Sequence, residues 1–273
     1  RSLEIGSRSI LWERAEWGDS PPLDATDERL WALIAAVRHN MPLSEISETS
    51  GVDPWFIERI ARIVEMERRL LAEDLTPALM HEAKRIGFGD TQIGTLADRL
   101  PAQVRSLRDE WDIRPVYKMV DTCAAEFEAV TPYFYGTYEE ENEAIPTEGS
   151  KMLVIGSGPI RIGQGIEFDY CSVQAAWALQ AAGVDAILAN SNPETVSTDF
   201  DTSSRLYFEP LDEESVRDLL ENEAGEDGEA PASVVQFGGQ TAVNMAGILA
   251  NAGLPIAGSS AEAIDIAEDR GRF

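Results

Sequence analysis

The segment from residue 151 to residue 210 constrains the fold more than any other part of this 273-residue chain. It reads KMLVIGSGPIRIGQGIEFDYCSVQAAWALQAAGVDAILANSNPETVSTDFDTSSRLYFEP. A short apolar strand is followed by a glycine-rich turn, an amphipathic helix and a second apolar strand. This order places backbone N–H groups at a helix N-terminus, where a bound anion is stabilised. The segment therefore predicts a ligand-handling α/β domain.

The alternation of strands and helices continues toward the C-terminus. We expect strands at residues 151–155, 184–189, 205–208, 233–237 and 254–257, and helices at about 166–182, 212–222 and 240–252. Alternating strands and helices with right-handed crossovers build a doubly wound parallel sheet. Residues 149–273 are therefore predicted to form a Rossmann-like α/β subdomain.

Residues 25–111 are predicted to form an all-helical domain, so the fold class is α + α/β. Apolar residues recur there at helical spacing, and almost no stretch is typical of a strand. A first helix is expected from Asp27, with an apolar stripe that reaches Val37. Further helices are expected near residues 44–49, 54–71, 77–86, 90–99 and 102–110. Ile46 and Ile57 recur 47 residues later as Ile93 and Val104, in the outline of a repeated helix-turn-helix. The second helix of the first unit is not basic enough to read DNA, and helix packing is the better interpretation.

Two further segments lie outside these domains, one before the first and one between the two. Residues 1–24 are irregular and include Ser-Pro-Pro at positions 20–22, which is typical of a linker. Residues 112–148 concentrate aromatic side chains and end near the acidic run 139–143. Because aromatic rings bury large areas, this connector is expected to lie as a strap against another surface.

The formal net charge of −27 limits the classes of partner. Residues 151–273 carry 20 acidic and 6 basic residues, so the acidity is not confined to a tail, and the chain has only three lysines. Such a chain is a poor candidate for nucleic-acid binding, and no apolar run is long enough for a membrane span. In molar salt the Debye length falls to about 3 Å, so self-repulsion is screened, and we expect a halophilic source. An ordinary acidic protein is the alternative. Two cysteines without a pairing pattern indicate a reduced, cytoplasmic location.

The glycine-rich turn matches neither common nucleotide fingerprint. Arg161 stands where the third glycine of G-x-G-x-x-G is expected, and the next strand ends in Asn190 instead of an acid for a ribose hydroxyl. The turn also lacks the G-K-[ST] of a P-loop. A dinucleotide-binding oxidoreductase therefore remains as a minor alternative.

Polar loops follow three of the predicted strands and should meet at the carboxyl edge of the sheet. The candidate loop residues are Gly156, Gly158, Gly163, Asn192, Gly239 and Thr241. Helix capping by Asn192 or Thr241 explains part of this polarity. Capping does not explain why three polar loops should meet at one edge of the sheet.

Three charged residues belong to the same loops. Arg161 offers a fork of donors to a carboxylate or phosphate, or it simply pairs with Glu167 or Glu194. The residues leave both interpretations open. His39 and His81 have no partners at ligand spacing, so we expect no metal site and assign no catalytic residue in this chain.

The motifs GSGPIRIGQGIEFDYC, NSNPETVSTDFDTSSRLYFEP, QFGGQT and AIDIAEDRGRF closely resemble the carbamoyl phosphate synthetase large-subunit family. RPVYKMVDTCAAEFEAVTPYFYGTYEEE is similar to the segment that joins its helical domain to its second synthetase half. The resemblance implies an oligomerisation domain at 25–111, a connector at 112–148 and a pre-ATP-grasp subdomain at 149–273. Residues 1–24 would then end the preceding synthetase half, and the chain would be a central fragment.

In this family, two ATP-grasp halves make carbamoyl phosphate from bicarbonate, glutamine-derived ammonia and two ATP, for arginine and pyrimidine synthesis. The resemblance implies a glutaminase small subunit, the ATP-grasp domains and further copies of the chain as partners. ATP and Mg²⁺ or Mn²⁺ would bind outside this fragment, which is expected to be inactive alone. By the same resemblance, Arg161, Gly165, Glu167 and Glu194 line a tunnel that carries carbamate to the second active site. A non-catalytic scaffold protein with the same fold is the alternative.

Overall fold

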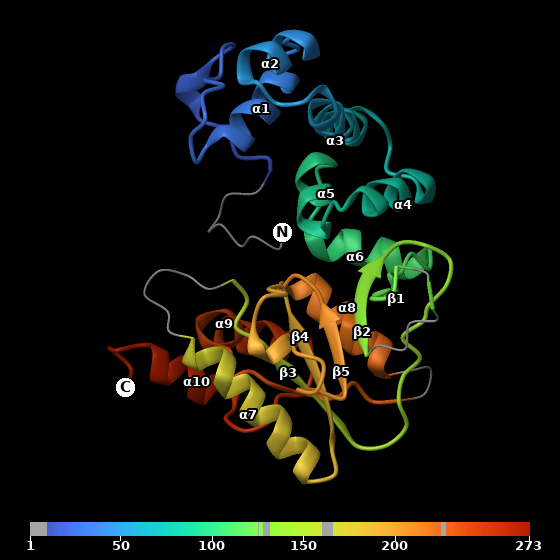
Figure 1. Cartoon of the computed structure of the whole chain (residues 1–273), viewed down its shortest axis with the longest axis vertical. Helices are drawn as coiled ribbons and strands as arrows, with labels where there is room; N and C mark the ends of the chain where they lie inside the picture. The colour runs from blue at the N-terminus through green and yellow to red at the C-terminus, as the bar shows by residue number, and fades with distance from the viewer. Residues whose placement is uncertain (1–9, 125, 128–131, 160–165, 225–227) are drawn as a thin grey trace. The chain divides into compact units, whose positions relative to one another are not determined.

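The computed structural model describes residues 10–124, 126–127, 132–159, 166–224 and 228–273 (Figure 1). Backbone contacts divide the chain into two compact units. Over the described residues, one unit ends at Ile113 and the other runs from Arg114 to Phe273. None of the described helices combines the length and apolar composition needed to span a lipid bilayer.

The first unit is built from helices over its described residues, as the sequence predicts. These are η1 (Ala15–Trp17), α1 (Arg29–Arg38), α2 (Leu43–Ser50), α3 (Pro54–Ala72), α4 (Pro77–Ile86), α5 (Asp90–Leu96) and α6 (Pro101–Glu110). The pair α5 and α6 begins 47 residues after the pair α2 and α3, which confirms the repeat seen in the sequence.

Local signals explain where these helices begin and end. Pro54 occupies the first turn of α3, and the Asp53 side chain accepts a hydrogen bond from the Trp55 backbone N–H at 2.9 Å. Thr76 caps α4 in the same way. Gly51 ends α2 in the left-handed conformation, which glycine adopts without a Cβ penalty.

An ion pair joins α1 to α3 beside their shared apolar core. That core includes Ile34 of α1, Ile46 of α2 and Ile57 of α3. The Arg38 guanidinium donates to both carboxylate oxygens of Glu67, each at 2.7 Å. The Glu67 side chain is only 4% exposed, so its charge depends on this bidentate contact.

The second unit contains a mixed six-stranded sheet in the order β1-β2-β5-β4-β3-β6. The strands are β1 (Val116–Met119), β2 (Tyr133–Thr137), β3 (Lys151–Ile155), β4 (Asp185–Asn190), β5 (Arg205–Phe208) and β6 (Ala232–Val234). The helices are α7 (Glu167–Ala181), α8 (Glu213–Ala224), α9 (Gly239–Asn251) and α10 (Ala261–Glu268), with the 3₁₀ turn η2 (Val196–Thr198). The parallel strands β6, β3, β4 and β5 confirm the α/β fold class.

Several segments differ from the expectation: α10 is not among the expected helices, and β6 is shorter than the expected strand at 233–237. The connector 112–148 supplies β1 and β2, which are antiparallel to each other, and β2 pairs with β5. Its rings Tyr117 and Phe134 belong to the sheet core instead of lying as a separate strap. The predicted strand at 254–257 is reduced to one bridge between Ser233 and Ile256, because Pro255 has no N–H to donate to a ladder.

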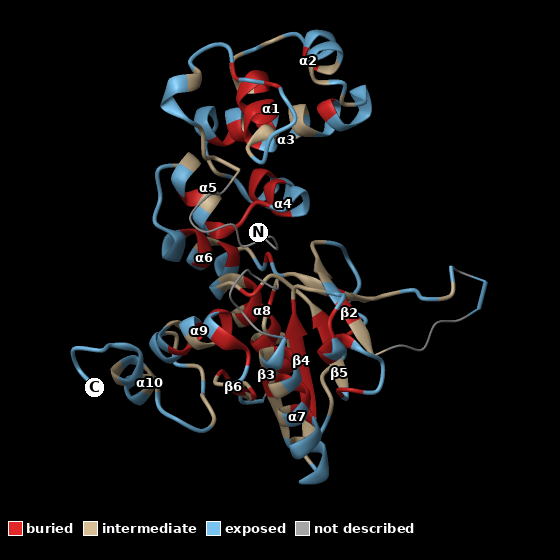
Figure 2. Ribbon diagram, turned by 60° about the vertical axis from the view of Figure 1, so that its left-hand side comes forward, coloured by how far each residue is buried: buried red, intermediate tan, exposed pale blue. Residues whose placement is uncertain are grey.

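Helices cover both faces of the sheet (Figure 2). On one face, Leu153 and Ile187 pack with Leu219 of α8 and Met245 of α9. On the other face, Val154, Leu188 and Leu206 pack against α7. Strand residues therefore alternate between two apolar surfaces, as expected for a sheet with helices on both sides.

A buried carboxylate lies at the amino ends of the parallel strands β3 and β5. Glu223 of α8 is fully buried and accepts a hydrogen bond from Arg205 at 2.6 Å and another from the Tyr207 hydroxyl. Lys151 lies 3.4 Å from the same carboxylate. Burial, followed by the Glu223 charge, raises the pKa of Tyr207 above its usual value.

Removal of Arg38 should destabilise the helical unit strongly. Arg38→Ala leaves the Glu67 carboxylate buried without its cation, which typically costs about 3–5 kcal/mol. Urea unfolding followed by tryptophan fluorescence measures this loss, because five of the six tryptophans lie in the helical unit. Arg69→Ala is the control: its partners Glu73 and Glu82 are half exposed and screened by water, so the loss should be much smaller. Equal stabilities for the two variants would contradict this interpretation.

Candidate functional site

The candidate site lies at the carboxyl edge of the parallel strands. Gly156 directly follows β3, the loop 191–195 follows β4, and Gly238 precedes α9 after β6. Because β4, β3 and β6 are neighbouring parallel strands, these three corners lie side by side.

The buried side chain of Asn190, the last residue of β4, joins two of the corners. Its Oδ1 atom accepts the backbone N–H of Gly158 at 3.0 Å and that of Asn192 at 3.3 Å. Its Nδ2 atom donates to the hydroxyls of Thr195 and Ser197, at 3.3 and 3.1 Å. All the hydrogen-bonding groups of this amide are used, so the loop after β3 and the loop after β4 are held together.

Close backbone approach explains two of the glycines. A Cβ atom on Gly156 would lie 2.7 Å from Cγ of Asn190. A Cβ atom on Gly238 would lie 2.5 Å from the carbonyl oxygens of Ile155 and Gly156. Neither distance is compatible with a side chain, so the three corners meet because glycine occupies these positions.

The acidic candidates stand on two of these elements. Glu167 is the first residue of α7, and Glu194 lies in the loop after β4; both are exposed. The backbone N–H of Glu194 donates to Oδ1 of Asn192 at 3.0 Å. The other tunnel candidates, Arg161 and Gly165, lie outside the described residues, as does Gly163.

Asn192 does not cap an α-helix, although its side chain makes a local hydrogen bond. Its side chain closes a turn onto Glu194 and caps no α-helix. For α9, the N-cap residue is Gly238, and Thr241 lies inside the first turn. Thr241 is therefore not the cap that the sequence suggested.

Two residues that organise the edge carried no role in the sequence-based prediction. In the sequence, Asn190 serves only as evidence against dinucleotide binding, because it is not an acid that could bind a ribose hydroxyl. Asp169, on α7, is 5% exposed, and its Oδ2 atom accepts the backbone N–H of Ser197 at 2.9 Å. A polar residue that ends an apolar strand was the available signal for Asn190. No comparable signal marks Asp169, which stands between Phe168 and Tyr170 in the first turn of α7.

Metal binding has no support in the described part of the chain. No group of three or more His, Cys, Asp or Glu side chains gathers closely enough there to hold an ion. His39 instead lies between Glu13 and Asp19, and the hydrogen bonds to these two acids raise its pKa. Both cysteines are free thiols.

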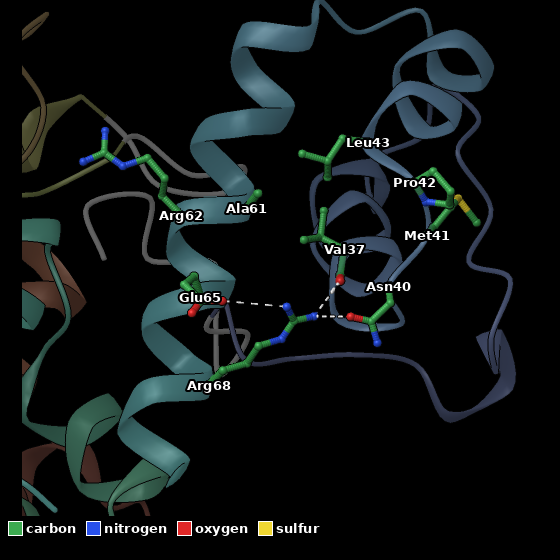
Figure 3. Close-up of a pocket in the computed structure, with 9 residues that line it drawn as sticks. All are labelled: Val37, Asn40, Met41, Pro42, Leu43, Ala61, Arg62, Glu65 and Arg68. Carbon is green, nitrogen blue, oxygen red and sulfur yellow. Dashed lines mark hydrogen bonds and ion pairs between the residues drawn. The ribbon is translucent and has the colours of Figure 1, made fainter. Parts of the chain in front are cut away.

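A separate open pocket of about 480 Å³ lies in the helical unit, between α1 and α3 (Figure 3). Arg68 donates there to the carbonyl oxygen of Val37 at 3.2 Å and to Oδ1 of Asn40 at 2.7 Å. These contacts satisfy acceptors at the C-terminus of α1, where a cation is favourable. Arg68 thus stabilises the C-terminus of α1. The residues that line the pocket include none of the predicted site residues.

The carboxyl edge offers shape and hydrogen bonding instead of a nucleophile. Exposed apolar side chains stand beside the acidic candidates, namely Ile166 next to Glu167 and Val196 near Glu194. The arrangement suits a wall that borders a small polar ligand, with fixed backbone and two projecting carboxylates.

A side chain at position 156 should disturb this edge. Gly156→Ala forces the Asn190 amide to move, and an overpacked site of this kind costs about 1–3 kcal/mol. Scanning calorimetry of the chain checks the loss. Gly247→Ala, on an exposed face of α9 with open space around it, is the control and should be neutral or slightly stabilising. A Gly156→Ala protein as stable as wild type would show that the amide is not held in place.

Two regions of the chain match family models. Residues 148–266 match the carbamoyl phosphate synthase preATP-grasp domain. Residues 1–112 match the carbamoyl-phosphate synthetase large chain, oligomerisation domain. The two matched regions correspond to the α/β sheet with its helices and to the helical unit.

Three curated relatives match this chain along its whole length, and they agree with the family models. The chain is 55% identical to the carbamoyl phosphate synthase large chain of Thermomicrobium roseum and 51% identical to that of Thermoanaerobacter sp. strain X514. It is 48% identical to that of Methanothermobacter thermautotrophicus. All of this chain is covered in each comparison, but only 25–26% of each relative.

The chain thus spans about a quarter of the length of these relatives, and both of its units match parts of the same large chain. The chain belongs to the carbamoyl phosphate synthase large-chain family, of which it contains the oligomerisation domain and a preATP-grasp domain.

Proposed function

We propose that this chain is the central part of a glutamine-dependent carbamoyl phosphate synthase, a ligase that consumes bicarbonate, glutamine-derived ammonia and two ATP. The observation that carries the proposal is the match of both units, in order, to two domains of one large chain. The synthase activity belongs to the intact protein. This part supplies an oligomerisation domain and one wall of a passage for carbamate.

The shape of the carboxyl edge supports the passage. Carbamate is a small anion with an amino group, so it needs hydrogen-bonding groups and open space, but no phosphate cradle. The backbone at Gly156 and Gly238 is packed too closely to accept a side chain, and Glu167 and Glu194 are exposed on the same edge. Arg161 would attract the anion, the two glutamates would hold Arg161 and narrow the passage, and Gly165 would leave it open.

Nucleotide and metal ion are assigned to other parts of the synthase. ATP with Mg²⁺ or Mn²⁺ supplies the phosphoryl groups of the reaction. The described residues include no acidic cluster that suits the ion. The Asn190 amide is already hydrogen-bonded to neighbouring loops. The same use of Asn190 weighs against a dinucleotide-binding oxidoreductase.

The proposal extends to partners and setting. A glutaminase small subunit would deliver ammonia, and the ATP-grasp domains of the same chain would cover the carboxyl edge. The helical unit would join copies of the large chain. Arginine and pyrimidine synthesis in the cytoplasm would use the product.

A bulky residue at position 165 tests the passage in the intact synthase. Gly165→Phe should abolish coupled carbamoyl phosphate synthesis while bicarbonate-dependent ATP hydrolysis in the first half continues. Gly247→Phe, at an exposed position of α9, controls for the added ring and should leave both rates unchanged. Normal coupled synthesis by Gly165→Phe would remove the passage assignment.

The acidic surface also supports a halophilic origin. A net charge of −27 with three lysines repels itself in dilute buffer, whereas about 1 M salt shortens the Debye length to about 3 Å. The thermal midpoint should therefore rise steeply between about 0.1 and 2 M KCl. A midpoint that does not change with KCl would rule out this origin.

A further inference from the structure

The loop that carries Glu194 is anchored mainly by its own neighbours. The Thr198 hydroxyl donates to the carbonyl oxygen of Pro193 at 3.0 Å, and Asn192 accepts the Glu194 N–H. Asn190 holds the hydroxyls of Thr195 and Ser197 from the end of β4. These contacts define the internal shape of the loop, but they do not connect it to α7.

Asp169 makes that connection. Its Oδ2 atom accepts the Ser197 backbone N–H at 2.9 Å, and both residues are buried. Asp169 lies two residues after Glu167 on α7, and Ser197 lies three residues after Glu194. This one hydrogen bond therefore links the element that carries one acidic candidate to the element that carries the other.

The contact with Ser197 uses only one of the two carboxylate oxygens of Asp169. Its Oδ1 atom is buried and has no hydrogen-bond partner among the described residues. An acceptor that loses water without gaining a donor destabilises the fold. Locally unfavourable groups that persist beside a site are often retained because they position functional residues.

We infer that Asp169 is a positioning residue for Glu194: through the Ser197 N–H it holds the Glu194 loop against α7 and so fixes Glu194 relative to Glu167. The inference rests on the proposed function, because Glu194 matters only if the carboxyl edge borders the carbamate passage. Asp169 itself touches no ligand. What it requires is an acceptor oxygen at the Oδ2 position, not a negative charge.

The test uses the intact synthase and the ratio of ATP hydrolysed to carbamoyl phosphate formed. Asp169→Ala removes the acceptor, so the Glu194 loop is no longer tied to α7 and carbamate is lost before it reacts. A displacement of about 1 Å can cost about 100-fold, and a partial release should raise the ratio roughly 3- to 10-fold. Asp169→Asn keeps an oxygen for the Ser197 N–H and should restore a ratio close to wild type.

Two controls separate positioning from loss of stability. Asp218→Ala removes an acid of α8 that is buried to a similar degree, and it should lower all rates together without changing the ratio. In a Glu194→Ala background, Asp169→Ala should raise the ratio no further, because both changes act through the same side chain. If Asp169→Ala does not fold, Asp169→Glu, which shifts the carboxylate by one methylene, should raise the ratio in its place.

The outcomes distinguish this inference from the proposal beneath it. If Glu194→Ala raises the ratio but Asp169→Ala does not, Asp169 has no positioning role. An Asp169→Asn ratio as high as that of Asp169→Ala would also overturn the inference, since charge would then be the property that matters. If Glu194→Ala leaves the ratio unchanged, the passage role of Glu194 fails, and the positioning role fails with it.

Discussion

The hydrogen bonds of the buried Asn190 amide determine the shape of the carboxyl edge. An amide in this position must satisfy two donors and an acceptor away from water, and it does so with groups from two different loops. This requirement brings Gly158 toward β4 and fixes the loop that carries Glu194. It also explains Gly156, because any side chain there would occupy the space of the amide.

Much of the fold follows from local sequence signals. β3, β4 and β5 are short, mostly apolar runs with polar or glycine residues at or beside their ends, and α8 has clear amphipathic spacing. The strands of the connector were missed because their pairing depends on partners far away in the sequence. β2 pairs with β5, about 70 residues later, and a short aromatic run does not reveal such a partner.

The candidate site was only partly predictable for a similar reason. Loops after parallel strands meet at one edge in any such sheet, so the general place of Gly156, Asn192 and Gly239 could be inferred. The buried contacts of Asn190 and Asp169 depend on the path of each loop, which residue types and spacing do not define. Thr241 looked like a cap because polar residues favour helix starts, but the backbone of α9 begins two residues earlier.

The backbone amides of Gly158 and Ser197 offer the most direct measurement of this arrangement. Both N–H groups donate to buried side chains, those of Asn190 and Asp169. Native-state hydrogen exchange should therefore show protection close to that of the central strands β3 and β4, although Gly158 lies in a loop and Ser197 in the short turn η2. Exchange as fast as that of an exposed loop would contradict the conclusion that these two side chains hold the edge of the sheet.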